Sequence, residues 1–416
     1  MSSFPQPDLA PSALSPAMVS WSQRAFMLRQ YGFRLFFLLM GLVAISSVAV
    51  WMAGLASGFW PKEAIAAAHW HGHEMLFGFA MAAVAGFLLT AVPNWAGTVR
   101  THGLPLTVLA GLWLGGRLGL LPGLGLAGAG ITGGLAALVD LAFIPALMAV
   151  LAPALIRAGG RRHGIFLGLL AGLCLANLLI HAEWLGLLDN GVRRGFLLAV
   201  NMLVVMVAVV AGRIVPAFTQ NALRQQGQLW EIPARPRLEQ AVVLSLLAMA
   251  GVELVAPDTA AVGAAATLVA GLTAWRLRSW RTGQTFRQPI LWILHLGAGW
   301  IPLALGFKAL ALLTGAAFTA SWLHAITIGV IATLILGVAT RVALGHTGRP
   351  LRVSPPVTAA YLLLTAAALV RISAPLRADP TPMLLLAGGL WITVFGLFVW
   401  EYFTILTTPR PDGKPG

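Results

Sequence analysis

The segment that decides the fold is HWHGHEMLFGFAMAAVAGFLLTAV, residues 69–92, which is followed directly by Pro93-Asn94-Trp95. Three histidines and a glutamate stand at its start, and the remainder is apolar and long enough for a membrane-spanning helix. A charged side chain at the bilayer centre costs roughly 2.5–3.5 kcal/mol, so polar groups in such a helix usually serve a function. Because neutral imidazole is the commonest metal ligand near neutral pH, the segment indicates a metal site at the mouth of a transmembrane helix.

The composition of the chain places it in a membrane. Of its 416 residues, 58% are hydrophobic and only 10% are charged, and the mean hydropathy is +0.85. This is more apolar surface than a soluble core of this size contains, so we predict an all-α, polytopic integral membrane protein in a lipid bilayer. The net charge of +14 comes from basic residues between apolar runs, which set membrane orientation and do not indicate a nucleic-acid partner. The single cysteine, Cys174, excludes an internal disulfide and a c-type haem attachment motif.

Apolar windows of about 20 residues predict twelve transmembrane helices. The windows are 33–55, 70–92, 104–122, 127–155, 163–187, 195–217, 239–257, 259–275, 289–313, 320–341, 355–374 and 382–406. The seventh and eighth are the least distinct, because only Pro257-Asp258 separates them, and we expect 218–238 to be a solvated loop. We therefore expect a disordered N-terminal arm over 1–32, a transmembrane domain over 33–408 and a tail over 409–416.

The distribution of Lys and Arg orients these helices. With the N-terminus inside, seven of the 27 basic residues fall on the outer side, namely Lys62, Arg117, Arg193, Arg194, Lys308, Arg371 and Arg377. The other 20 lie in inner loops or at inner helix ends, as the positive-inside rule requires. Twelve helices with both termini in the cytoplasm satisfy this distribution.

The predicted topology sorts the histidines by depth. An outer layer contains His69, His71, His73, His181 and His324. An inner group contains His295 and His346, whereas His102 and His163 fall in cytoplasmic loops, where we expect them to be solvated. The outer layer is therefore the place where several imidazoles are available at one depth.

Helical spacing limits which outer histidines share an ion. In a regular helix His69 and His73 lie on one face, and His71 lies nearly opposite to both. All three therefore cannot ligate one ion from a helix. If Gly72 marks an unwound entrance, His71 and His73 either chelate one ion together or serve different centres. Interfacial histidines bonded to headgroups or loops remain the alternative for each residue alone.

Four other polar residues fall inside the predicted helices. Asp140 lies near the middle of the fourth helix, so we expect it to be protonated, paired or next to a water-filled path. Arg117 and Glu183 lie toward the outer side, where they either neutralise haem propionates or anchor the helix ends. Asn177 is four residues before His181 and either supports that imidazole or bonds a neighbouring helix.

The inner side carries three arginines in polar motifs at helix ends, namely Arg213, Arg341 and Arg349. Such a group either binds an anion or haem carboxylates through charge-assisted hydrogen bonds, or serves as ordinary positive-inside anchoring.

Several strings resemble the NnrS family of bacterial inner-membrane proteins of the nitric-oxide response. They are WHGHEMLFGF (70–79), GFLLTAVPNW (86–95), GRIVPAFT (212–219), LHLG (294–297) and LGHTGR (344–349). The resemblance implies a twelve-helix protein that contains haem and copper, is associated with denitrification and protects against nitrosative stress. The family-like positions are His71, His73, Asn177, His181, His295, His324 and His346. Ala96 departs from the pattern, because a threonine is expected there.

The resemblance and the residues together predict a haem–copper protein that binds or transforms nitric oxide or a nitrosylated species. We expect a b-type haem whose contacts come from His73, His324, Arg117, Arg213 and Arg341. The metal ligands are expected among His71, His73, His181, His295, His324 and His346, with an outer copper on His71 and His181 favoured. The electron donor is unknown. The alternatives are a secondary transporter of an anion or metal complex, and a sensor or assembly factor without catalysis; the two halves of the chain show no self-similarity.

Overall fold

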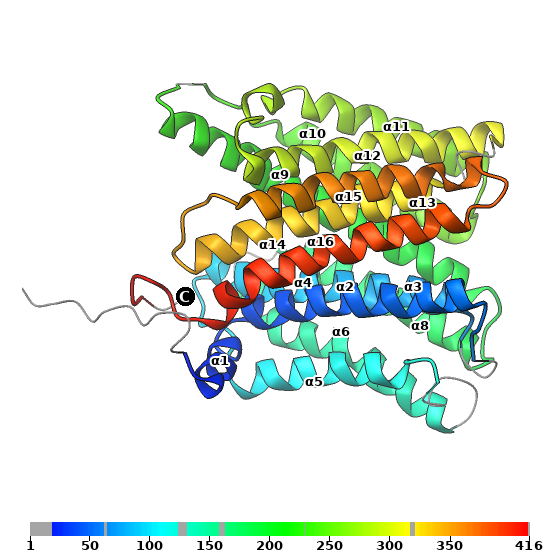
Figure 1. Ribbon diagram of the computed structural model, residues 1–416. Coiled ribbons are helices and arrows are strands. Elements are labelled where there is room, and N and C mark those ends of the chain that lie inside the picture. The colour runs from blue at the N-terminus through cyan, green and yellow to red at the C-terminus, as the bar shows by residue number, and fades with distance from the viewer. Residues whose placement is uncertain are drawn as a thin grey trace, which may run out of the picture.

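The chain folds into long helices that lie side by side along one axis (Figure 1). The computed structural model describes residues 19–61, 65–123, 131–157, 163–228, 230–316 and 321–414, and it contains no strand within these ranges. Eleven helices among the described residues are long and apolar enough to cross a membrane. The prediction of an all-α polytopic membrane protein is therefore confirmed.

The spans follow the predicted windows closely, including the weakly separated seventh and eighth. They are α2 (Gly32–Ser57), α3–η2–α4 (Ala67–Ala96), α6 (Ile131–Arg157), α8 (Ile165–Trp184), α9 (Gly191–Gln225), α10 (Pro236–Val255), α11 (Ala260–Leu277), α12 (Pro289–Thr314), α13–η5–α14 (Trp322–His346), α15 (Pro355–Ser373) and α16 (Thr381–Thr407). The short 3₁₀ turn η3 (Thr282–Gln284) stands outside them, whereas η6 (Ala374–Leu376) continues the span of α15 to Leu376.

The predicted third span is the short helix α5 (Leu104–Gly119). Its 16 residues extend about 24 Å, which is less than the roughly 30 Å of a hydrocarbon core. The two ends of the described chain nevertheless meet on one side of the bundle, where Arg24 Nη1 donates to Thr407 Oγ1 over 2.7 Å. An even number of crossings is needed for this, so α5 supplies the twelfth. The side that faces the cytoplasm remains a prediction.

Two connecting segments differ from expectation. Residues 1–18 of the predicted disordered arm lie outside the described residues, but Trp21–Leu28 forms helix α1, because Ser20 and Gln23 make a capping box at its start. Helix α9 continues through Pro216 to Gln225, so the predicted loop over 218–238 begins eight residues late. A buried face, including Thr219, keeps this extension packed on the bundle.

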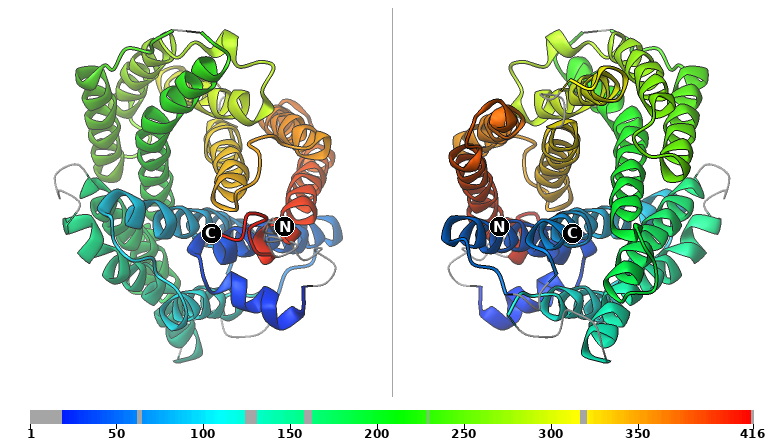
Figure 2. Two further views of the ribbon diagram at one scale, coloured as in Figure 1. Left: turned by 90° about the vertical axis from the view of Figure 1, so that its left-hand side faces the viewer. Right: turned by 90° about the vertical axis from the view of Figure 1, so that its right-hand side faces the viewer.

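The helices form a closed ring when viewed along their axis (Figure 2). α16 closes the ring by packing against α2, where Trp391 Nε1 donates to the Ala44 carbonyl over 2.9 Å. At the opposite end of the same contact, Arg34 Nη1 donates to the Leu406 carbonyl over 2.7 Å. α5, α10 and α11 pack on the outside of this ring (Figures 1 and 2).

Three spans face the middle of the ring. Buried residues make up 83% of the apolar window in α3–η2–α4 and 78% in both α9 and α13–η5–α14, whereas no other span exceeds 61%. Two of the three contain a π-helix, η2 (Glu74–Ala80) and η5 (Ala325–Ala332). Because π-turns inside helices occur frequently at functional sites, these two segments direct attention to the histidines beside them.

Candidate metal and cofactor sites

The two family-like histidines of α3 (Ala67–His73) point to different sides. α3 is a regular helix, so residues two positions apart project roughly 200° apart. The ring of His71 stacks on Trp51 of α2 with centroids 4.6 Å apart, whereas His73 lies 5.2 Å from the ring of Trp184 on α8. Gly72 is therefore not an unwound entrance, and each histidine belongs to a different site.

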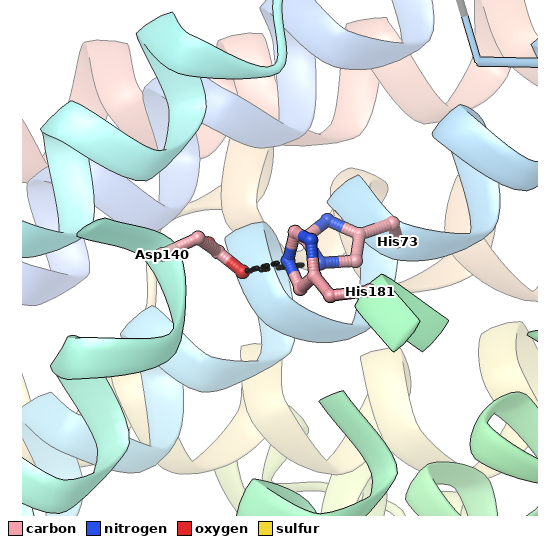
Figure 3. Close-up of side chains that lie close together, drawn as sticks. All are labelled: His73, Asp140 and His181. Carbon is pink, nitrogen blue, oxygen red and sulfur yellow. Dashed lines mark hydrogen bonds and ion pairs between the residues drawn. The ribbon is translucent and has the colours of Figure 1, made fainter. Parts of the chain in front are cut away.

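The carboxylate of Asp140 on α6 faces the neighbouring imidazoles of His73 and of His181 on α8 (Figure 3). Its Oδ2 atom lies 2.9 Å from His181 Nε2 and 3.3 Å from His73 Nε2. Asn177, one turn before His181, donates from Nδ2 to the same Oδ2 over 2.8 Å, and its Oδ1 lies 2.9 Å from His73 Nε2. The ligand atoms of His73, Asp140 and His181 all lie within 4.8 Å of one another, so they can converge on one ion. We call these three residues the His73 site.

Two further charged residues, Arg117 and Glu74, border the His73 site. The Arg117 guanidinium contacts Asp140 Oδ1, and its Nη1 lies 3.3 Å from Glu74 Oε1. The same Glu74 oxygen lies 3.4 Å from His73 Nδ1. None of these residues is more than 8% exposed. With neutral imidazoles, two carboxylates and one guanidinium leave one net negative charge in this buried group.

A second site lies on the other side of α3. A cavity of about 320 Å³ is lined by His71, His324 of α13 (Trp322–His324) and Arg371 of α15, and otherwise mostly by apolar side chains, including Trp51 and Trp391. His71 Nδ1 is buried and has no hydrogen-bond partner within the described part of the chain. An unpaired buried nitrogen costs free energy, so it marks a position for a ligand. We call this the His71 cavity.

The structure groups the outer histidines differently from the pairing that the sequence favoured. The sequence placed His73 with His324 and His71 with His181, because it fixed only their depth. Helix rotation instead brings His73 to His181 and His71 to the cavity that His324 also lines. His69 belongs to neither site and lies with its ring 6.2 Å from that of Phe196.

On the inner side, His295 is fully engaged by hydroxyl groups. Its Nε2 lies 2.8 Å from Thr219 Oγ1 and its Nδ1 lies 3.0 Å from Thr282 Oγ1. Two family-like strings, 212–219 and 294–297, therefore meet at this contact. Both ring nitrogens are engaged in this arrangement, so His295 serves here as a packing and hydrogen-bonding residue of the helix ends.

His346 and the inner arginines lie apart from His295. His346 lines a polar cavity of about 150 Å³ together with Arg100 and Arg410. Arg213 lies 5.6 Å from the centroid of the Phe166 ring, and Arg341 lies 3.9 Å from that of Phe218. Arg349 donates to Thr408 Oγ1 over 3.1 Å. These three predicted anion-binding arginines thus contact different helices, and Arg341 and Arg213 line neither outer site.

Sequence reasoning missed two groups. Arg371 was counted only as an outer charge, although it lines the His71 cavity. The ion pair between Lys308 Nζ and Glu253 Oε2, 2.6 Å apart, is buried between α12 and α10, and Asn201 Nδ2 donates to the same oxygen over 2.6 Å. The signal was a glutamate inside the window 239–257 and a lysine inside 289–313, since charges within apolar spans require partners.

Comparison with known protein families supplies the identification. A family model described as NnrS protein matches residues 27–410, which is nearly the whole chain. The chain belongs to the NnrS family. A comparison with curated proteins finds no match. Membership of the NnrS family suggests a multi-pass membrane protein of the nitric-oxide response, and the buried His73 site is compatible with metal binding.

Proposed function

We propose that the protein is a haem–copper protein of the nitric-oxide response in a bacterial inner membrane, with haem in the His71 cavity and copper at the His73 site. One observation supports this most directly: two histidines of one helix face two separate buried sites, and different helices complete each. The proposed ligand is nitric oxide or a nitrosylated species.

The residues of the His71 cavity fit a b-type haem. Haem iron takes one or two axial imidazoles, and His71 and His324 both line the cavity. Arg371 supplies a cation for the propionate carboxylates, a role that the sequence had given to Arg117. Trp51 and Trp391 provide flat apolar walls, and the buried His71 Nδ1 without a partner is a nitrogen available to ligate.

The residues of the His73 site fit a copper ion. Two imidazoles and a carboxylate suit copper and other first-row metals, and Asn177 and Arg117 already orient the carboxylate. A monovalent Cu(I) ion would bring the net charge of this group from minus one to zero. Such neutrality would reduce the cost of burying charge at this site.

When bound, the haem iron would coordinate the nitrogen oxide ligand and the copper would supply one-electron exchange. The chain would hold the two groups on different sides of α3. Its apolar cavity walls exclude solvent, and Asp140 Oδ2 accepts the Nε2 proton of His181. Ligation through that nitrogen would require the tautomer with its proton on Nδ1, and because protonated imidazoles cannot ligate, copper affinity should fall as the pH is lowered.

The experiment is metal analysis and optical spectroscopy of the purified full chain and three variants. We expect His71→Ala to shift or remove the Soret band while copper stays, and His73→Ala to remove copper while the Soret band stays. The control is His69→Ala, on the same helix but in neither site, which should change neither. A wild-type protein with neither haem nor copper refutes the proposal. If both His71→Ala and His73→Ala affect the same cofactor, the assignment to two sites is wrong.

A further inference from the structure

A third cavity lies in the middle of the bundle, and no role has been given to it. It has a volume of about 60 Å³ and lies among α2, α4 (Met81–Ala96), α9 and α14 (Thr333–His346). Every residue that lines it has an apolar side chain, including Phe37, Ala83, Met206, Ala211 and Ala339. We call it the central cavity.

The central cavity follows the His71 cavity along the same helices, toward their inner ends. On the η2–α4 helix, Phe79 and Ala80 line the His71 cavity, and Ala83 and Val84 line the central cavity one turn later. The η5–α14 helix repeats this order, with Ile331 followed by Leu334 and Ile335. Further along α4, Leu89 and Thr90 line the polar cavity of His346. The central cavity therefore lies on the bundle axis between the other two.

Its size and lining restrict what it can hold. A volume of about 60 Å³ exceeds the roughly 10–15 Å³ that one water-sized molecule needs, but it is far below the 320 Å³ of the His71 cavity. A water needs two to four polar partners, and the lining offers none, so water is disfavoured there. An ion would lose its hydration without compensation. Small uncharged molecules remain.

We propose that the central cavity binds a small uncharged gas and is an intermediate binding site on the axial path to the His71 cavity. The identity of the gas as nitric oxide rests on the proposed function, whereas the binding of an apolar gas rests only on the cavity. The inert gas xenon separates the two, because apolar cavities of this kind bind it without any metal.

The test is xenon binding to the purified full chain in detergent, followed by ¹²⁹Xe NMR. We expect a saturable site in the wild type. Ala211→Leu and Ala339→Leu fill the cavity from two different helices, so each should weaken xenon binding about tenfold or more. The matched control is Ala264→Leu, an exposed position on α11, which should retain wild-type binding. Thermal unfolding shows which variants are folded. If only one of the two cavity-filling variants folds, that variant alone is enough to test xenon binding.

A kinetic measurement then tests the path. In haem-loaded protein, carbon monoxide released by a light pulse should rebind more slowly in the filled variants, with an unchanged Soret maximum. No saturable xenon site in the wild type, or equal xenon binding in all variants, refutes the cavity as a gas site. Xenon binding as expected with unchanged rebinding refutes the path only. Absence of haem refutes the proposed function and leaves the xenon result standing.

Discussion

Replacement of Asp140 by asparagine tests whether the carboxyl group is ionised inside the membrane. In the wild type, Oδ2 accepts from Asn177 and from His181, and Oδ1 faces the Arg117 guanidinium. Asparagine keeps the shape but exchanges one oxygen for an NH₂ donor. In one rotamer this donor faces Arg117, and in the other it faces Asn177 and His181. Both rotamers therefore bring two donors together in a buried site.

The size of the effect follows from what Arg117 retains. Removal of one partner from a buried ion pair costs about 3–5 kcal/mol. Arg117 keeps a second carboxylate, since Glu74 Oε1 lies 3.3 Å from its Nη1. We therefore expect the lower end of this range, about 3 kcal/mol, which is a change of roughly a hundredfold in the unfolding equilibrium constant.

The assay is reversible unfolding of the metal-free full chain in mixed micelles. Asp140→Asn should lower the free energy of unfolding by about 3 kcal/mol, and adding both Arg117→Met and Glu74→Gln should recover part of that loss, because neither the guanidinium nor its second carboxylate then remains buried without a partner. The control is Asp189→Asn at an exposed loop position, with a change within about 0.5 kcal/mol. If Asp140→Asn stays within about 1 kcal/mol of wild type, the carboxyl group is protonated, and the charge argument for Cu(I) fails.

Three further predictions concern other parts of the chain. Glu253→Gln should cost about 3 kcal/mol of unfolding free energy because it leaves Lys308 buried and uncompensated, whereas Glu253→Gln with Lys308→Met should cost less; equal losses in both would show that the pair is not charged. Thr219→Val removes a hydroxyl partner from a buried imidazole and should cost about 1–3 kcal/mol without changing haem or copper content, and a lost cofactor would contradict its structural role. Reporter fusions at Arg224 and Arg410 should both report cytoplasm, and a periplasmic signal at either position contradicts the orientation derived from Lys and Arg.

The positions of the helices were accessible from the sequence because span length is set by the membrane. The apolar windows near 33–55 and 289–313 match α2 and α12 to within two residues at each end. Pro257-Asp258 alone was enough to predict the boundary between α10 and α11. The extension of α9 to Gln225 was not accessible, since a proline and polar residues there suggest a loop. The reason that α9 continues is visible only in the structure, where Thr219 of the extension is buried and contacts His295.

Which polar side chains meet in the folded protein could not be predicted from the sequence. Depth can be counted along a helix, but which residues meet also depends on the rotation of each helix and on how the ring closes. The opposite directions of His71 and His73 followed from spacing in a regular helix. Their partners did not, because His181 and His324 are at similar depths on different helices. For Asp140 the sequence left a protonated, a paired and a water-exposed carboxyl group open, and its pairing with Arg117 required the structure.

The arrangement of the cavities also bears on the rival transporter interpretation. Polar groups are available at the two ends of the axis, in the His71 cavity and around His346. Between them the central cavity has a wholly apolar lining, and it is bounded by the three most buried spans. An anion or a charged metal complex that moved along this axis would lose its hydration there and meet no compensating dipole or charge, at a cost of many kcal/mol. A small uncharged gas pays no such penalty. The same segment that would oppose ion transport would therefore permit gas to reach the proposed haem, and for this reason we favour the haem–copper interpretation over the transporter.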